Sequence, residues 1–422
     1  MLRTFFRWEN VDHPIQIILK EHRFLPRYLD FSEKTIDEVQ KHLEEIKAKD
    51  RKEKFDLQNP PFRVTLCKIE KKRYILMLSH HHILFDGWSN GIILKELFDN
   101  YHRLLWGKPL VKPVKTKFKE YIKCLNRQNH QEARIYWKSY LDGSPGGTHL
   151  SIKKERHNTD KYPVRISPQV PPDLTEGLRQ LAAAGKVTTA AVIYTAWGLL
   201  LQRCSDSNDV MVGITVSGRS VGLKGIQDMV GLFINTLPLR VKCSSRQTVT
   251  QLLTEIHTTM SQWETQETTP LVDIKKYGGF DRTEPFDTLV AVENYPLDPG
   301  LLNKEAPLSI CSFSIDEIPH YDLTLTVFTE VKDLRIDMVY DNSTLAPQMV
   351  EQMAGHFMTI LQDLSLYPGK KVLELEILSE GEKKKLLNRF NDTAAEYPQE
   401  KTLHYLFSQQ VQKTPAKPAL RH

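Results

Sequence analysis

The chain has 422 residues, 40% of them hydrophobic, which predicts two or three domain-sized units with sizeable cores. The net charge of +5 is modest, and no concentrated basic stripe with interleaved aromatic residues is visible, which argues against a nucleic-acid-binding protein. No apolar run approaches the roughly 18 residues that cross a bilayer. No signal peptide is visible at the first residues. The five cysteines form no CxxC pair, which favours reduced thiols in the cytoplasm over a disulfide framework.

The first part of the chain predicts a mixture of strands and helices. Apolar runs and helical spacing of apolar residues mark them. Strands are expected twice within residues 1–20 and over residues 62–69 and 73–78, and helices over residues 35–49, 89–105, 118–125 and 131–141. Ser89 is the expected N-cap of the second helix.

A break follows at Ser144-Pro145-Gly146-Gly147 and in the polar stretch after it, where we place a boundary between two lobes. The second part restarts the alternation of helices and strands. Helices are expected over residues 174–184, 190–203, 249–263 and 347–364, and strands over residues 210–216, 288–292, 323–327 and 334–340. Residues 230–240 are expected to form a further strand with a turn at its front. The helix at 190–203 is apolar nearly all round, which predicts that it is buried. The mixture predicts an α/β or α+β class.

One stretch combines the residues best suited to catalysis: Ser79-His80-His81-His82-Ile83-Leu84-Phe85-Asp86-Gly87-Trp88-Ser89. Successive side chains of an extended chain point to opposite sides, so one of His81 and His82 is expected to face the interior and the other a cavity. Asp86 is expected to hold the loop closed by a salt bridge or backbone hydrogen bonds, and Gly87 to allow a tight bend.

From residue types alone, two other interpretations of these histidines stay open. Consecutive histidines are potential metal ligands, but a metal site needs ligands from several places, and no partner His or Cys spacing lies nearby. The other interpretation is an ordinary core histidine, buried and hydrogen-bonded, with no part in catalysis.

The stretch from His81 to Gly87 resembles the HHxxxDG signature of condensation domains in nonribosomal peptide synthetases, which the wider chloramphenicol-acetyltransferase-like superfamily shares. Residues 230–240, VGLFINTLPLR, are similar to that family's VGxFxNTxxxR motif. A third similar stretch is residues 285–290, PFDTLV, followed by residues 293–296. The three motifs stand in the family's order, and the resemblance covers nearly the whole chain.

The resemblance implies an α/β (α+β) fold of two chloramphenicol-acetyltransferase-like lobes in a V-shaped pseudo-dimer, with the active site at their junction in a tunnel. It divides the chain into an N-terminal lobe at residues 1–145, truncated at its front, a C-terminal lobe at 160–380, and a linker with the start of an adenylation domain at 381–422. The chain is therefore expected to be a fragment of a longer, multifunctional, cytoplasmic enzyme of antibiotic biosynthesis.

The implied reaction is an acyl transfer that forms an amide bond between a donor acyl or peptidyl thioester and the α-amine of an acceptor aminoacyl thioester. Phosphopantetheine arms of upstream and downstream peptidyl carrier domains bring the two substrates, and an adenylation domain is expected in cis. We expect no bound cofactor, no metal, no nucleic acid and no membrane. An inert condensation-like recruitment module and a stand-alone acyltransferase using coenzyme A are the alternatives.

Among the residues of the signature, the resemblance implies that His82 faces the tunnel as a general base or a positioning group. An ordinary histidine pKa near 6.5 suits either role. His81 is expected to be buried and structural. Gly87 is expected to turn a backbone amide toward the oxyanion that forms in the reaction.

The resemblance also implies residues that brace the site. Asp86 is the expected architectural brace, salt-bridged to Arg3, with Arg63 as the rival partner. A second brace at the lobe junction and three side chains along the tunnel complete the candidates: Asn235, and then Trp88, Ser89 and Asn294. For Asn294, a solvated turn is the alternative.

Overall fold

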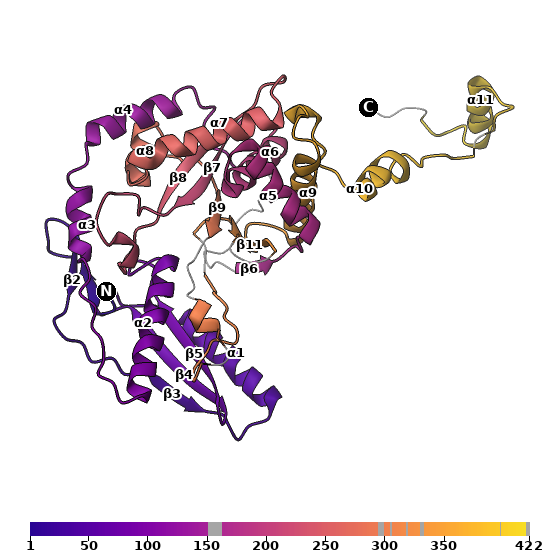
Figure 1. Ribbon diagram of the computed structural model, residues 1–422. Coiled ribbons are helices and arrows are strands. Elements are labelled where there is room, and N and C mark those ends of the chain that lie inside the picture. The colour runs from indigo at the N-terminus through magenta and orange to yellow at the C-terminus, as the bar shows by residue number, and fades with distance from the viewer. Residues whose placement is uncertain are drawn as a thin grey trace. The chain divides into compact units, whose positions relative to one another are not determined.

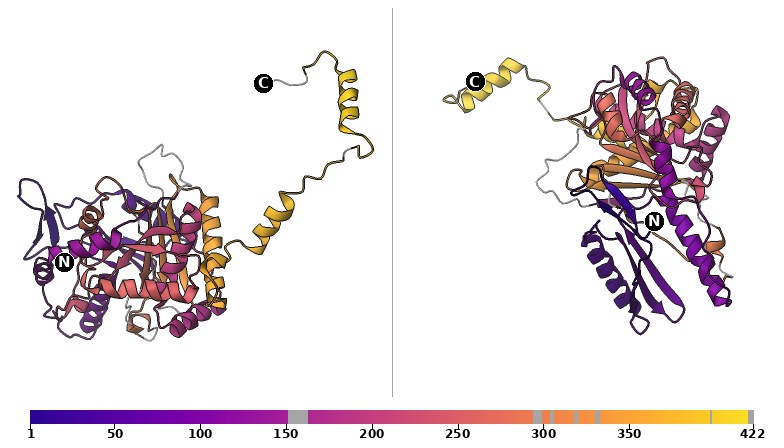
Figure 2. Two further views of the ribbon diagram at one scale, coloured as in Figure 1. Left: turned by 90° about the horizontal axis from the view of Figure 1, so that it is seen from above. Right: turned by 90° about the vertical axis from the view of Figure 1, so that its left-hand side faces the viewer.

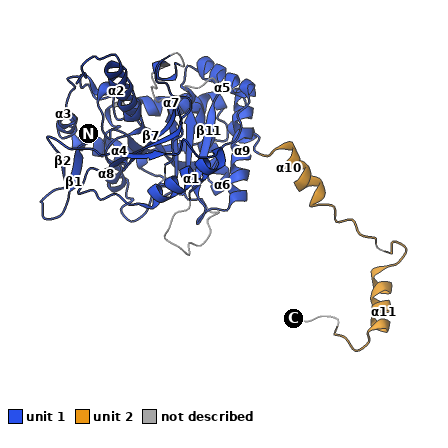
Figure 3. Ribbon diagram, turned by 90° about the horizontal axis from the view of Figure 1, so that it is seen from below, with its two compact units in different colours: residues 1–377 blue, residues 378–422 orange. Residues whose placement is uncertain are grey.

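The computed structural model (Figure 1) describes the chain over residues 1–150, 163–293, 299–303, 306–317, 320–329, 333–396 and 398–418. It forms two compact units, Met1–Ile377 and Leu378–His422 (Figure 3). Most of the segment expected to separate the two lobes, residues 151–162, lies outside the described residues, as does Asn294.

The N-terminal lobe contains a three-stranded sheet, a two-stranded sheet and four helices within the described residues. The elements are β1 (Thr4–Arg7), β2 (Ile15–Ile18), β3 (Arg27–Asp30), α1 (Ile36–Lys52), β4 (Phe62–Glu70), β5 (Arg73–His80), α2 (Gly87–Leu105), α3 (Phe118–Leu125) and α4 (His130–Leu141). The expected helices and strands of this part are confirmed. The short β3, which pairs with β4, was not expected, because four residues reading RYLD carry no apolar pattern.

The sheet that carries the histidines is ordered β3-β4-β5, with β3 parallel and β5 antiparallel to β4. Helices α1 and α2 lie on opposite faces of this sheet (Figure 2). Helix α1 starts at a capping box, in which Thr35 and Glu38 satisfy each other's backbone N–H groups. It buries Val39 and Leu43 against the sheet.

Helix α2 begins two residues earlier than expected. Asp86, not Ser89, is the N-cap, because the carboxylate of Asp86 accepts a hydrogen bond from the N–H of Ser89. The strand β5 ends at His80, so the remaining two histidines lie in the short turn between β5 and α2.

The C-terminal lobe is built on a six-stranded sheet with the order β6-β11-β10-β9-β7-β8. Its elements are β6 (Pro163–Ile166), α5 (Pro172–Gly185), α6 (Thr189–Ser205), β7 (Asp209–Val216), β8 (Asn235–Lys242), α7 (Val249–Gln262), α8 (Leu271–Tyr277), β9 (Thr288–Glu293), β10 (Leu323–Phe328), β11 (Arg335–Asp341) and α9 (Pro347–Leu366), with short 3₁₀ turns between them. The predictions for this part are confirmed, including the burial of α6, whose residues from Ala191 to Gln202 are all buried.

The two lobes repeat one local topology. In the N-terminal lobe, β3 runs parallel to β4, β5 pairs antiparallel with β4, and α2 follows. In the C-terminal lobe, β9 runs parallel to β10, β11 pairs antiparallel with β10, and α9 follows. The chain therefore contains two lobes of similar construction, as the order of predicted elements indicated.

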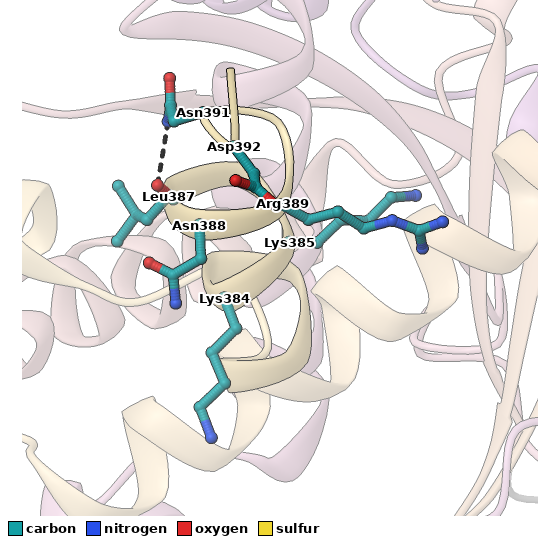
Figure 4. Close-up of a pocket in the computed structure, with 7 residues that line it drawn as sticks. All are labelled: Lys384, Lys385, Leu387, Asn388, Arg389, Asn391 and Asp392. Carbon is teal, nitrogen blue, oxygen red and sulfur yellow. Dashed lines mark hydrogen bonds between the residues drawn. The ribbon is translucent and has the colours of Figure 1, made fainter. Parts of the chain in front are cut away.

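The second unit is small and has no buried residue in its helices. It contains α10 (Glu380–Lys384), a π-helical turn η5 (Lys385–Arg389) and α11 (Leu403–Lys413). A surface depression lies at the end of α10, along η5 and the turn after it, and its seven lining residues are all exposed (Figure 4). The side-chain amide of Asn391 closes the turn there, since it donates to the carbonyls of Leu386 and Leu387 at 2.9 and 3.0 Å. None of the candidate site residues lines this depression.

Candidate active site

The turn after β5 is fixed by its backbone. The N–H of His81 donates to the carbonyl of Pro61 at 3.0 Å, and the N–H of Leu84 donates to the carbonyl of His81 at 3.1 Å. Leu84 and Phe85 are completely buried beside Phe62. The apolar half of the turn therefore anchors it, and the histidine half is left near the surface.

His80 is the most enclosed of the three histidines. Its ring stacks on Phe85, with the ring centroids 4.0 Å apart and the planes inclined by 20°. Desolvation, followed by repulsion from charged His82 and His81, lowers the pKa of His80 to about 4. His80 is therefore neutral near pH 7.

His81 is exposed, so the expectation that it is buried was wrong. Its Nδ1 accepts a hydrogen bond from the N–H of Ile83 at 3.1 Å, which places the proton of the neutral ring on Nε2. Desolvation, followed by repulsion from a charged His82, lowers the pKa of His81. The ring thus stabilises the turn, although it does so at the surface.

His82 is exposed, and its ring centroid lies 6.4 Å from that of His80. Within the described part of the chain, no hydrogen bond or ion pair is formed by the His82 ring. This imidazole is therefore accessible from the surface. The expectation that it faces a tunnel stays a prediction.

Asp86 is the buried anchor of the loop, with no exposed surface. Its Oδ1 accepts hydrogen bonds from the N–H and the Oγ of Ser89 at 3.1 and 2.8 Å, and its Oδ2 accepts one from the N–H of Phe233 at 3.1 Å. The Nη2 of Arg219 lies 3.1 Å from Oδ1 and 3.3 Å from Oδ2. The carboxylate therefore joins the histidine loop to a segment of the C-terminal lobe.

Arg219, not Arg3, is the cation that pairs with Asp86. Arg3 is exposed and donates to the carbonyl of Lys20, while Arg63 pairs with Asp50 at 3.0 Å. Both expected partners were wrong. The Asp86 carboxylate is buried against residues of the C-terminal lobe, and Arg3 and Arg63 bond to other residues.

Arg219 is itself fully enclosed. Its Nη1 donates to the carbonyls of Ile226 and Met229 at 2.7 and 3.0 Å, and its guanidinium lies 3.9 Å above the ring of Phe233. Burial lowers the pKa of Arg219, while the Asp86 carboxylate acts in the opposite direction. The sequence shows only that Arg219 follows β7 after a glycine, which does not distinguish it from the other cations.

Further hydrogen bonds connect the same two segments. The N–H of Asp86 donates to the carbonyl of Gly231 at 3.1 Å, and the Oγ of Ser89 bonds both the carbonyl and the N–H of Gly231. The indole N–H of Trp88 donates to the carbonyl of Gln227 at 3.1 Å. Ser89 is completely buried in this junction, so the expectation that it lines an open passage was wrong.

Asn235 stands at the first position of β8. Its Nδ2 donates to the carbonyls of Glu267 and Thr269 at 2.8 and 2.6 Å. The Glu267 carboxylate in turn accepts from the N–H of Ser220, the neighbour of Arg219, at 3.1 Å. These contacts all lie within the C-terminal lobe, and they support the segment that carries Arg219. A role for Asn235 at the lobe junction stays a prediction.

The described residues present neither grouped metal ligands nor a single helix suited to a bilayer. No group of three or more His, Cys, Asp or Glu side chains is arranged to hold a metal ion there. Among the same residues, no helix alone combines the length and hydropathy of a membrane span, and α5 and α6 reach both only as a pair bent by 106°.

The sequence of residues 1–387 matches the family described as Condensation domain. Bacitracin synthase 3 from Bacillus licheniformis is 32% identical over all of this chain, which corresponds to 7% of that protein. Tyrocidine synthase 2 from Brevibacillus parabrevis is 34% identical, also over all of this chain and 12% of that protein. The chain therefore spans less than a fifth of the length of these relatives.

Solved structures share the fold. The crystal structure of holo-AB3403, a four-domain nonribosomal peptide synthetase, aligns with a TM-score of 0.78 at 18% identity, over 98% of this chain and 32% of that one. The first condensation domain of the calcium-dependent antibiotic synthetase aligns with a TM-score of 0.72 at 19% identity, over 90% and 87% of the two chains. The predicted α/β fold of two chloramphenicol-acetyltransferase-like lobes is confirmed.

Proposed function

Because the chain belongs to the condensation-domain family of nonribosomal peptide synthetases, we propose that it joins two carrier-bound substrates through an amide bond. The acceptor's α-amine nitrogen attacks the carbonyl carbon of the donor thioester. The carbon–sulfur bond breaks, the donor's thiol leaves, and the amine loses one proton, which balances the thiolate. Phosphopantetheine arms of two carrier domains present the substrates, and no cofactor of the chain's own takes part.

The observation that carries this proposal is the pairing of an exposed His82 with a fully buried support. An α-amine has a pKa of about 7.7–8.0, so part of it is already neutral near pH 7 and a strong base is not required. The imidazole of His82 accepts a hydrogen bond from the attacking amine, or its proton, and returns that proton to the leaving sulfur. Asp86 and Arg219 keep the loop in place and carry no proton.

The oxyanion of the tetrahedral intermediate needs hydrogen-bond donors. Gly87 is the first residue of α2, so its N–H belongs to the first turn of the helix, whose amides lack partners within the helix. The positive end of the helix dipole adds to the effect of such an amide. We assign the oxyanion contact to this amide.

The compartment and the neighbouring domains belong to the same proposal. The five cysteines, all in the described part of the chain, form no disulfide, as in a reducing cytoplasm. We place an adenylation domain in cis, and carrier domains on either side of the site.

The experiment supplies both carrier domains loaded with their aminoacyl groups and detects the dipeptidyl thioester by mass spectrometry. The proposal expects product on the acceptor carrier only when both loaded carriers are present. Product from a coenzyme A thioester in place of the donor carrier would identify a stand-alone acyltransferase. Binding of both carriers with no product would identify an inert recruitment module.

A further inference from the structure

Positive charge is concentrated in the segment that leads from α2 through α3 and α4. Residues 108–138 contain nine Lys or Arg and two Glu, a net charge of +7, whereas the whole chain carries +5. The other 391 residues together therefore carry a charge of −2. The positive charge is therefore a local feature of residues 108–138, because the rest of the chain is slightly acidic.

Most of these cations are unpaired. Lys115 pairs with Glu96, and Lys123 pairs with Glu120 at 3.1 Å. The other seven are exposed and form no ion pair within the described part of the chain: Lys108, Lys112, Lys117, Lys119, Arg127, Arg134 and Lys138. Their mutual repulsion is relieved when an acidic partner approaches.

Helices α3 and α4 follow one another along one side of the first unit (Figure 1). Two exposed isoleucines lie among the cations of these helices. Ile122 is 39% exposed and Ile135 is 61% exposed. We call the outer surface of the two helices the basic face; it comprises Lys117, Lys119, Ile122, Arg127, Arg134, Ile135 and Lys138. The two helices also carry Glu120, which pairs with Lys123, and the exposed Glu132. An apolar contact among charges that are mostly of one sign is typical of a surface that docks a protein.

The aromatic residues of these helices point inward. Tyr121 and Trp137 are buried, and Phe118 packs on Phe233 with ring centroids 5.2 Å apart. Single-stranded nucleic acids are held by aromatic rings that stack on their bases. The basic face offers none of these rings, which favours a protein partner over RNA.

The inner side of α3 supports the active site. The ring of Tyr121 lies 4.6 Å from that of Phe233, and the N–H of Phe233 donates to Asp86. The basic face is thus the outer surface of a helix that packs on the residues holding the histidine loop. A partner docked there would lie one helix away from that loop.

We propose that the basic face docks the acidic face of a carrier domain that delivers substrate to His82, an inference that rests on the function proposed above. The cations steer the carrier and set its orientation, and the two isoleucines supply the apolar contact. Binding through such a face is weakened by salt, because the charges involved are exposed and screened.

Binding is measured with the full chain and a fluorescein-labelled carrier domain without loaded substrate, at about 50 mM and about 200 mM salt, between which the Debye length shortens. The test variant combines Arg127→Glu, Arg134→Glu and Lys138→Glu. The control variant combines Lys41→Glu, Arg246→Glu and Arg282→Glu, three exposed cations that form no ion pair in the described part of the chain. Both variants change the net charge equally.

We expect the Kd of the test variant to rise about tenfold or more at low salt and to lose most of its salt dependence, while the control stays within about twofold. Equal effects of the two variants would overturn the docking proposal. Tight binding of a single-stranded RNA oligonucleotide that displaces the carrier and is lost in the test variant would also overturn it.

This result is separable from the proposed function, because the Kd is measured without chemistry. Dipeptide formation by the wild-type chain together with an unchanged Kd in the test variant would overturn the docking surface alone. A failure of the wild-type chain to form dipeptide from two loaded carriers would overturn the proposed function, whatever the Kd.

Discussion

The Nη2 of Arg219 lies 3.1 Å from Oδ1 of Asp86, and the two residues are separated by 133 positions in the sequence. Arg219 is 3% exposed and Asp86 is completely buried. The pair therefore ties the histidine loop of one lobe to the other lobe at a place that water does not reach. Removing one member of such a pair leaves the other as an uncompensated buried charge.

We expect Arg219→Ala to lower the free energy of unfolding by about 3–5 kcal/mol, because it strands the Asp86 carboxylate. Urea unfolding followed by tryptophan fluorescence measures the change. Arg3→Ala is the matched control, since Arg3 is exposed, and its effect is expected to stay within about 0.5 kcal/mol. An equal loss in the two variants would mean that Asp86 is not stabilised by Arg219.

A glycine beside this pair is constrained by its neighbours. Gly218 has φ +62°, and a Cβ atom there would lie 1.9 Å from the carbonyl oxygen of Phe233. We expect Gly218→Ala to destabilise the protein by about 2 kcal/mol or more, because the left-handed backbone and the clash both oppose a side chain. Condensation should fall as well, since the N–H of Phe233 holds Asp86.

The control for that substitution is Gly222→Ala. A Cβ atom at Gly222 meets no heavy atom within 4 Å, and the residue is exposed. Its melting temperature is expected to stay unchanged or to rise slightly, because alanine restricts the unfolded chain. If the Gly218→Ala and Gly222→Ala proteins had the same melting temperature, the segment around Gly218 would accommodate the alanine without a loss of stability.

Local patterns in the sequence were sufficient for most elements of the fold. The apolar helix α6 and the alternation of helices and strands in both lobes follow from the spacing of apolar residues. That spacing is a local property, so it can be read from the sequence alone. Arg219 could not be found in this way, because its role depends on a tertiary contact, and 57 residues are Lys or Arg. The alternation of side chains along a strand also failed to predict the position of His81. The extended backbone ends at His80, and side chains no longer alternate beyond it.

The stack of His80 on Phe85 predicts a pH dependence of stability. The folded-state pKa of His80 is about 4, below the ordinary value of 6.5. Between these values the unfolded chain binds a proton at His80 that the folded chain does not, so the free energy of unfolding falls as the pH falls from 6.5 to 4. At about 1.4 kcal/mol for each pH unit, the loss of stability attributable to His80 over this range is about 3 kcal/mol.

His80→Phe keeps an aromatic ring on Phe85 and removes the titrating group. We expect the variant to lose less stability than the wild-type protein between pH 7 and pH 5, as measured by urea unfolding at both pH values, since only the wild-type gains a proton at residue 80 on unfolding. Parallel losses in the two proteins would assign the acid sensitivity to other groups.

The role proposed for His82 is in the reaction and not in the fold, because its ring is exposed and forms no hydrogen bond or ion pair within the described residues. We expect His82→Ala to lower the rate of dipeptide formation by about 10²–10⁴, the range for loss of a general base, with the melting temperature unchanged. A residual rate is expected because the two tethered reactants are still held together.

His13→Ala, at another exposed histidine, serves as the control and should retain full activity. If His82→Ala formed product as fast as His13→Ala, the His82 imidazole would neither accept the proton nor position the amine. The oxyanion contact at Gly87 and the tethering of both substrates would then have to account for the rate.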